Sequence, residues 1–314
     1  MTYPIPASNG TASFPARYDI RHATTYRYSE SVPVCHNEIH LVPRSLPAQR
    51  LLSTSLQVEP QPAQLATRVD YFGNTVGLVS IDEPHERLVV TSTSRVEIDP
   101  PRDWQSFEWL PWESLRDRLK HDIDPVTLDA RQYTYDSPLV RGSPRLAAWA
   151  AASFTPSRPW AEAVVDLTRR IHREFAYDPT ATTTSTPVEE VFGLKRGVCQ
   201  DFAHLQIACL RSLGLAARYV SGYLSNERRV QGTAGDGAND AGMVGADASH
   251  AWLSCWGGED GWLDVDPTND CTVGTLHVTV AWGRDYADVS PIKGVCVGGG
   301  SHAIQVAVQV SRIG

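Results

Sequence analysis

The spacing of apolar residues divides the chain into a strand-rich first third and a mixed remainder. From Tyr18 to Tyr28 the even positions form one set, which is the period of a strand with two different faces. Similar short runs, separated by Pro, Gly and Asn, predict further strands near 38–42, 51–59, 66–71, 75–81 and 88–98. Regular short strands with little helical spacing predict an antiparallel β-sandwich over residues 14–100.

The remainder of the chain alternates between helical and strand patterns. Residues 161–177 carry apolar positions three and four apart, and residues 199–213 do the same, which is typical of helices with a buried face. Shorter helical signals begin near 145 and at 187. Strands are predicted at 217–224, 250–256, 262–265, 278–282 and 303–312. We therefore predict an α+β protein in which the second part packs helices on an antiparallel sheet.

These patterns divide the chain into four segments. Residues 1–13 are polar and are expected to form a flexible N-terminus. Residues 14–100 form the β-rich domain, and residues 101–145, rich in Pro, Trp, Asp and Arg, are expected to be a linker with short helical pieces. Residues 146–314 form the second domain, whose last strand is a candidate to return to the N-terminal sheet. The Gly-, Asn- and Asp-rich loop at 225–248 is long enough to be a candidate lid.

Composition then excludes several classes of protein. The chain has 314 residues, of which 42% are hydrophobic and 20% charged, as in a soluble globular protein. A net charge of −8 argues against nucleic-acid binding, and the absence of an 18-residue apolar stretch argues against a membrane span. The N-terminus lacks a signal-peptide pattern and the six cysteines are scattered, so we expect a cytoplasmic protein with free thiols.

The negative charge is concentrated in one segment. Residues 230–283 contain no Lys or Arg but hold eight acids, whereas the rest of the chain has 28 acids and 28 bases. The whole surplus of negative charge therefore lies in this segment.

Three residues have the properties of a thiol nucleophile and its partners. Cys199 follows Gly197 where a helix is predicted to begin, and free N–H groups there favour a thiolate and can face a developing oxyanion. A thiol nucleophile needs a base, and the base needs an orienting group. His250, which opens the strand at 250–256, is the candidate base. Asp264 and Asp266 share one face of the next strand. Asp266 is expected to lie nearer to His250, because a hairpin pairs the start of one strand with the end of the other.

The sequence around these residues resembles the bacterial transglutaminase-like superfamily. The motifs are RGVCQDFAH at 196–204, SHAW at 249–252 and WLDVDPTN at 262–269, and residues 18–44 and 294–301 are similar to regions of one bacterial branch. The resemblance implies a papain-like, transglutaminase-like core. It also implies that Cys199 is the nucleophile, that His250 takes and returns a proton, and that Asp266 holds the imidazole.

Neighbouring residues have more ordinary interpretations. Asp201 can cap the first turn of the helix or support the site, and Asn269 can anchor the following turn or support the site. His204 points away from the Cys199 face and is expected on the helix surface or in the core. Zinc sites usually show close ligand pairs, whereas Cys199 and His250 are far apart in sequence, so we predict no metal site and no cofactor.

We therefore expect a thiol-dependent acyl-transfer enzyme that cleaves an amide or peptide bond through a Cys199 thioester. A cysteine peptidase or amidase resolves the thioester with water, and a protein-glutamine transglutaminase resolves it with an amine; we favour hydrolysis because no acceptor site is legible. A non-catalytic binding module on the same fold is the alternative from another class. Because the acidic segment contains His250 and Asp266, we expect a neutral or cationic peptide or protein amide as substrate.

Overall fold

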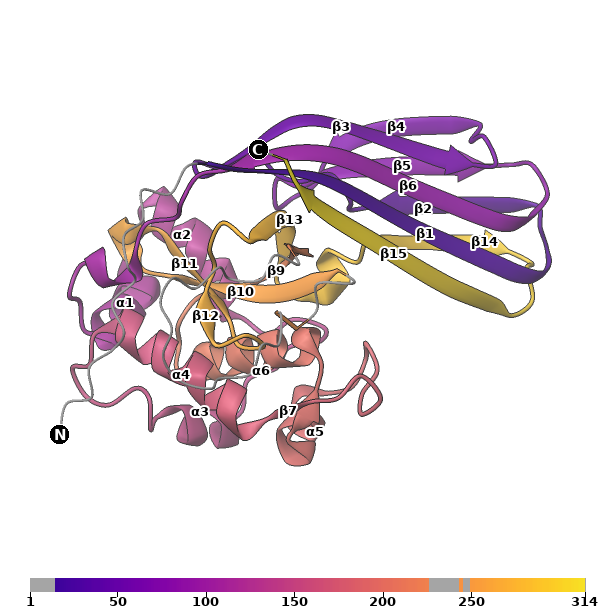
Figure 1. The fold of residues 1–314 in the computed structure, drawn as a ribbon. Helices are drawn as coiled ribbons and strands as arrows, with labels where there is room; N and C mark the ends of the chain where they lie inside the picture. The colour runs from indigo at the N-terminus through magenta and orange to yellow at the C-terminus, as the bar shows by residue number, and fades with distance from the viewer. Residues whose placement is uncertain (1–14, 226–242, 245–248, 314) are drawn as a thin grey trace, which may run out of the picture.

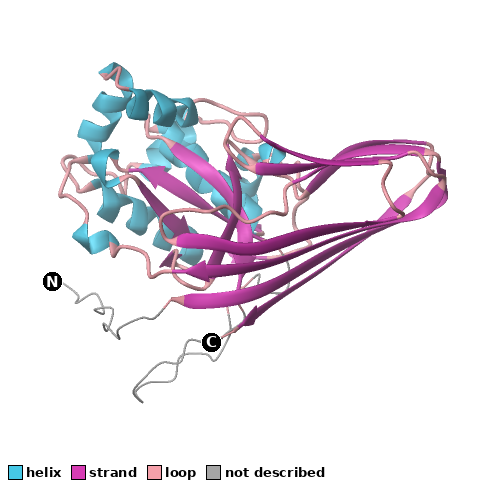
Figure 2. Ribbon diagram, turned by 90° about the horizontal axis from the view of Figure 1, so that it is seen from above, coloured by secondary structure: helices cyan, strands magenta, loops and turns pink. Residues whose placement is uncertain are grey.

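A β-sandwich and a second sheet covered by helices lie side by side in the structure (Figures 1 and 2). The computed structural model describes residues 15–225, 243–244 and 249–313. Within these residues the protein is α+β, as the sequence predicts, with a β-rich N-terminal part and a mixed part after it. No helix in these ranges is long and apolar enough to cross a membrane.

The sandwich consists of two antiparallel sheets with strand orders β15-β1-β6-β3 and β14-β2-β5-β4. Side chains alternate between buried and exposed, as expected for strands with one covered face: Tyr18 and Ile20 are buried, and Arg17 and Arg21 are exposed. The strands are β1 (Ala16–Val32), β2 (Val34–Ile39), β3 (Gln49–Glu59), β4 (Gln64–Val69), β5 (Thr75–Ile81), β6 (His85–Ile98), β14 (Ile292–Val297) and β15 (His302–Arg312).

The C-terminal hairpin completes the N-terminal sandwich. β15 pairs with β1 in one continuous antiparallel register, from Tyr18 opposite Arg312 to Tyr28 opposite His302. Strand β14 was not predicted from the sequence, and it pairs with β2 in the other sheet. The turn between β14 and β15 contains Gly298–Gly300, which adopt positive φ angles that glycine tolerates best. The two ends of the chain therefore build one sandwich.

The second sheet has the strand order β12-β11-β10-β9-β13. Its strands are β9 (Ala217–Leu224), β10 (His250–Trp256), β11 (Trp262–Asp266), β12 (Cys271–Thr272) and β13 (His277–Gly283). A separate short parallel pair joins β7 (Ala176–Tyr177) and β8 (Arg196–Gly197). The helices are α1 (Trp112–His121), α2 (Pro125–Arg131), α3 (Pro144–Ala150), α4 (Trp160–Glu174), α5 (Val188–Leu194) and α6 (Cys199–Ser212), with single 3-10 turns η1 (Trp104–Ser106), η2 (Gln132–Thr134), η3 (Gly258–Asp260) and η4 (Tyr286–Asp288).

Helix α6 is the centre of the second part. Every residue from Gln200 to Arg211 is buried, and a helix buried all round belongs in the middle of a core. Its polar side chains are therefore hydrogen-bonded: Gln206 Nε2 donates to Thr168 Oγ1 at 2.7 Å, and Arg211 donates to the carbonyl of Tyr133 at 2.9 Å. This packing fixes the first turn of α6, where Cys199 lies.

The segment expected to be a linker, 101–145, is part of this core. Helices α1 and α2 fall within it, and Trp112, Leu115, Leu119 and Ala130 are buried in the same apolar cluster as α6. The segment showed no clear period because its helices are short, and Pro111 and Pro125 stand at the starts of α1 and α2. It therefore joins the two parts as packed structure.

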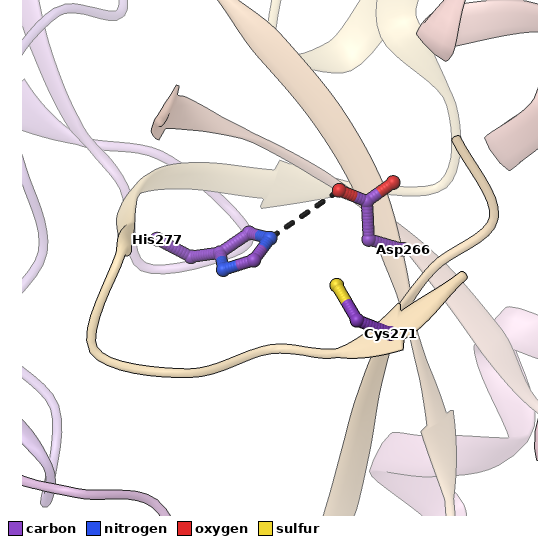
Figure 3. Close-up of side chains that lie close together, drawn as sticks. All are labelled: Asp266, Cys271 and His277. Carbon is purple, nitrogen blue, oxygen red and sulfur yellow. Dashed lines mark hydrogen bonds and ion pairs between the residues drawn. The ribbon is translucent and has the colours of Figure 1, made fainter. Parts of the chain in front are cut away.

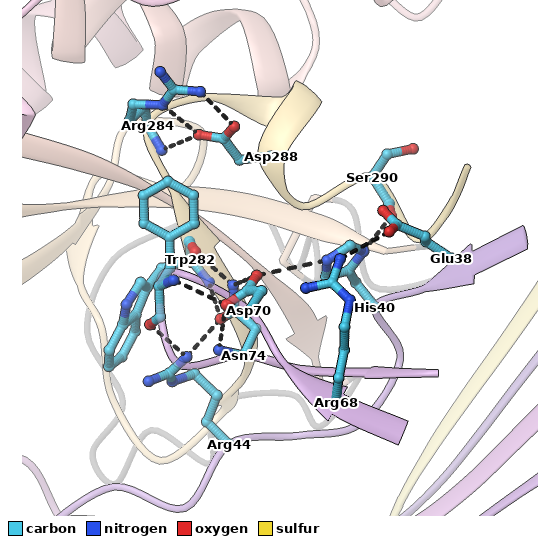
Figure 4. Close-up of polar contacts among 11 residues, drawn as sticks. Glu38, His40, Arg44, Arg68, Asp70, Asn74, Trp282, Arg284, Asp288 and Ser290 are labelled. Atoms are coloured by element: carbon cyan, nitrogen blue, oxygen red, sulfur yellow. Dashed lines mark hydrogen bonds and ion pairs between the residues drawn. The ribbon is translucent and has the colours of Figure 1, made fainter. Parts of the chain in front are cut away.

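Side-chain amides from the sandwich cover the free edge of the second sheet. β13 is an edge strand, and the backbone N–H and carbonyl of Thr279 bond to the side chain of Gln49, both at 2.8 Å. Asn74 pairs in the same way with Trp282, and the Arg44 guanidinium lies 3.6 Å from the centre of the Trp282 ring (Figure 4). These bonds satisfy backbone groups that an edge strand otherwise leaves open.

Candidate functional site

Cys199 is the first residue of α6, directly after strand β8. The carboxylate of Asp201 turns back and accepts from the Val198 N–H at 2.9 Å and from the Thr182 hydroxyl at 2.6 Å. Burial raises the pKa of Asp201 against the effect of these two bonds. Asp201 thus caps the helix, one of the two roles predicted for it. Gly197 makes this turn possible, because a Cβ there would lie 2.6 Å from Asp201 Oδ2.

His250 opens strand β10 and is fully buried. Its Nε2 lies 2.8 Å from Asp266 Oδ2, and neither side chain is exposed to solvent. Its Nδ1 is buried and has no hydrogen-bond partner among the described residues. Burial lowers the pKa of His250, but the charge of Asp266 and the neighbouring Cys199 outweigh it and raise this pKa to about 10. The imidazole therefore interacts with both the Asp266 carboxylate and the Cys199 thiol.

Asp266, the last residue of β11, is surrounded by donors. Its Oδ1 accepts from the backbone N–H groups of Thr268 and Asn269, at 2.9 and 3.3 Å. Its Oδ2 accepts from His250, from the Asn269 side-chain amide at 2.7 Å and from His277 Nε2 at 3.3 Å. Burial alone would raise the pKa of Asp266, but the contacts with His250 and His277 hold it well below its usual range. The carboxylate is held ionised and in one orientation.

The rival carboxylate, Asp264, belongs to another contact. It stands opposite Ser254 in the β10–β11 ladder and accepts a hydrogen bond from that hydroxyl. Burial raises the pKa of Asp264. The bond to His250 is made by Asp266, as the argument from hairpin geometry favoured.

His204 is buried in the core beside the second sheet. Its Nε2 accepts from the Tyr286 backbone N–H at 3.1 Å, and burial lowers its pKa to about 4. Asn269 contacts the site directly: its amide bonds to Asp266 and lies 3.5 Å from His250 Nε2. It also pairs with the backbone of Val244, at 2.9 and 3.3 Å. Apart from residues 225, 243 and 244, the loop proposed as a lid lies outside the described residues.

Two residues of the site were missed from the sequence. His277 begins β13 and donates through Nε2 to Asp266, while its Nδ1 accepts from the Gly274 N–H at 3.4 Å. The Trp252 ring lies beside both His250 and His277, with centroids 6.1 and 5.2 Å away. The contact of His277 depends on the strand order of the second sheet, which no spacing in the sequence reveals, whereas Trp252 shares a strand face with His250 two residues before it.

Comparison with known proteins identifies the family. A family model of the bacterial transglutaminase-like N-terminal region matches residues 18–97, and a model of the transglutaminase-like superfamily matches residues 147–267. A solved structure from Cytophaga hutchinsonii, described as a candidate cysteine protease, superposes with a TM-score of 0.74 at 21% identity over 96% of this chain and 92% of that one. The fold is thus the papain-like α+β fold of transglutaminase-like proteins.

Two relatives extend the comparison. An uncharacterized protein of Mycobacterium tuberculosis is 39% identical over 305 residues, covering 94% of this chain and 92% of that protein. A protein-glutamine gamma-glutamyltransferase of Pseudomonas aeruginosa is 34% identical over 152 residues, which cover 46% of this chain and 21% of that protein. The chain belongs to the transglutaminase-like superfamily and carries its bacterial N-terminal region.

Proposed function

We propose that the protein is a thiol-dependent acyl-transfer enzyme that acts on an amide. The observation that carries the proposal is the buried His250–Asp266 pair, whose imidazole interacts with Cys199 at the start of α6. The raised pKa of His250 favours an imidazolium, and an imidazolium beside a thiol stabilises the thiolate that attacks a carbonyl.

The proposed reaction has two halves. Cys199 Sγ attacks the amide carbonyl, and the first-turn N–H groups of α6 are the donors we expect for the oxyanion. The tetrahedral intermediate collapses, the amine leaves with a proton from His250, and a thioester remains on Cys199. His250 then takes a proton from water as the water attacks, the free acid leaves, and the thiolate is restored. Asp266 holds the imidazole throughout.

Selective labelling of Cys199 tests the proposal. A neutral alkylating reagent at pH 6 should modify Cys199 about 100-fold faster than the exposed thiol of Cys296, because only a stabilised thiolate reacts well at that pH. His250→Ala should remove the difference, and Cys199→Ala should abolish turnover. Equal labelling of both thiols in the unmodified protein would instead favour a binding module on the same fold.

Hydrolysis and transamidation differ only in the acceptor. We favour a peptidase or amidase, because water is always present and the described residues around Cys199 show no amine-binding site. The transglutaminase alternative draws support from the similarity to the Pseudomonas aeruginosa gamma-glutamyltransferase over 46% of the chain. Incubation with a glutaminyl peptide and a labelled amine separates the two: label incorporation faster than release of free acid would overturn the preference for hydrolysis.

The expected preference for neutral or cationic substrates is modest. Several acids of the acidic segment have arginine neighbours from elsewhere in the chain: Asp260 lies 2.7 Å from Arg102, and Asp270 lies 3.8 Å from Arg169. Such neighbours reduce the local surplus of negative charge. We propose a severalfold advantage for a basic peptide over an acidic one at low salt, and the reverse order would contradict it.

A further inference from the structure

Three side chains from three different strands, one of them Asp266, converge beside His250. Cys271 of β12 is the direct antiparallel partner of Asp266 of β11, and His277 opens β13 (Figure 3). One ligand atom from each lies within 4.8 Å of the other two, and His277 Nε2 is 3.3 Å from Asp266 Oδ2. Asp266 belongs to the proposed catalytic site and His277 bonds to it, whereas Cys271 has no role in the proposed reaction.

The three donors match the ligands of zinc-class cations. Zinc binds carboxylate oxygen, imidazole nitrogen and thiolate sulfur, often with three protein ligands and one open position. Bonds of about 2.0 to 2.3 Å at tetrahedral angles separate ligand atoms by roughly 3.3 to 3.6 Å. The distance between His277 Nε2 and Asp266 Oδ2 already has this value. Rotation of the half-buried Cys271 side chain can bring its sulfur to the same separation from these two atoms. Two negative ligands also balance the charge of a divalent cation.

We propose that Asp266, Cys271 and His277 bind a thiophilic divalent cation such as Zn²⁺, and that binding inhibits the Cys199 site. The inhibition rests on the proposed function, whereas the binding does not. Asp266 Oδ2, the oxygen nearest His277, is also the oxygen that bonds to His250. A cation on that oxygen competes with His250 Nε2 for its lone pairs and weakens the bond that orients the imidazole.

The surrounding hydrogen bonds make this a reversible site. Without metal, the Gly274 N–H points at His277 Nδ1, so the ring proton is on Nε2 and is donated to Asp266. Metal binding needs the Nε2 lone pair, so the proton moves to Nδ1 and the long 3.4 Å contact with Gly274 is lost. Asp266 keeps the backbone N–H groups of Thr268 and Asn269 on Oδ1. The apo arrangement is therefore complete in itself, and metal competes with it.

Metal titration of the full chain tests the binding. In a Cys199→Ala background, which removes the catalytic thiol as a ligand, Co²⁺ should give a near-ultraviolet thiolate charge-transfer band that Zn²⁺ displaces. Cys271→Ser should abolish the band and weaken Zn²⁺ binding at least about tenfold, measured against a chelating dye. Cys296→Ser, which changes an exposed thiol elsewhere, is the matched control and should change neither.

A second variant of Cys271 distinguishes the loss of a metal ligand from misfolding of the protein. Cys271→His supplies another zinc ligand and should recover Zn²⁺ binding without the thiolate band. Zn²⁺ binding that persists at full strength in Cys271→Ser, or none in the Cys199→Ala protein, would overturn the site.

Inhibition is measured separately, with Cys199 present. Zn²⁺ should lower turnover, and Cys271→Ser should raise the half-inhibitory concentration about tenfold or more when each rate is scaled to its own metal-free value. If the half-inhibitory concentration does not change, the proposed inhibition is wrong. If the protein turns over no amide at all, the proposed function fails, and the spectroscopic titration still decides whether the metal site exists.

Discussion

Asp266→Asn isolates the contribution of the buried carboxylate. Asparagine keeps the size of the side chain but removes the charge beside His250. Both partners are fully buried with a 2.8 Å contact, so solvent screens their attraction little. The His250 pKa of about 10 against an ordinary 6.5 corresponds to about 5 kcal/mol at 1.36 kcal/mol per pH unit, to which Asp266 and Cys199 both contribute. Since breaking a buried pair typically costs 3–5 kcal/mol, we expect a loss of roughly 3–5 kcal/mol in unfolding free energy.

This loss should depend on pH and fall off on both sides of a maximum. The pKa of His250 is raised in the folded state, so its contribution is complete below about pH 6.5 and disappears as the pH rises toward about 10. The pKa of Asp266 is lowered, so its contribution is present above about pH 3.8 and is lost as the pH falls. The difference between the two proteins should therefore be largest between about pH 4 and 6.5.

Urea unfolding followed by tryptophan fluorescence at pH 5, 7 and 9 measures this difference. Asp117→Asn is the matched control, because that carboxylate is exposed on α1 and its loss should stay within about 0.5 kcal/mol. A difference between wild type and Asp266→Asn that is independent of pH, or that grows toward pH 9, would refute the assignment of a charged His250–Asp266 pair.

Two further substitutions probe the surroundings of the pair. Gly222→Ala should destabilise the fold by at least about 2 kcal/mol in thermal melts, because the new Cβ would lie 2.1 Å from the Val278 carbonyl and 2.3 Å from the Trp252 ring. Gly193→Ala is the control: its new Cβ would meet nothing within 4 Å, so it should be neutral or slightly stabilising in the same melts. Asn269→Ala removes a donor from Asp266 and should slow alkylation of Cys199 about tenfold without changing the circular dichroism, and an unchanged rate would show that Asn269 only anchors its turn.

Local sequence signals predicted those parts of the molecule that depend on neighbouring residues. The strands at 217–224 and 250–256 have the predicted bounds, because a short run bounded by turn residues is the local signal of a strand buried along its whole length. The start of α6 at Cys199 could be located for the same reason. The preference for Asp266 over Asp264 also followed from local geometry, since one short turn joins β10 to β11.

Parts that depend on tertiary contacts could not be predicted. Segment 101–145 gave no clear period, yet it packs against α6, since its helices derive their stability from burial. The strand was predicted at 278–282, so His277 fell just outside it and carried no signal of its own. Its approach to Asp266 requires β13 to lie on the far side of β9, so that the chain crosses from β12 at one edge of the sheet to β13 at the other. Strand order is set by long-range packing, so it leaves no trace in local spacing.

The N-terminal sandwich has a physical connection to the proposed chemistry through that same strand. His277 belongs to β13, an edge strand whose outer backbone groups bond to Gln49 at Thr279 and to Asn74 at Trp282. On its other side, β13 pairs with β9, which is the neighbour of β10 and therefore of His250. Side-chain amides thus hydrogen-bond the backbone N–H and carbonyl groups of this edge, as a neighbouring strand would. The sandwich therefore fixes the edge that supplies His277 to Asp266, and the two parts of the chain form one structural unit around the site.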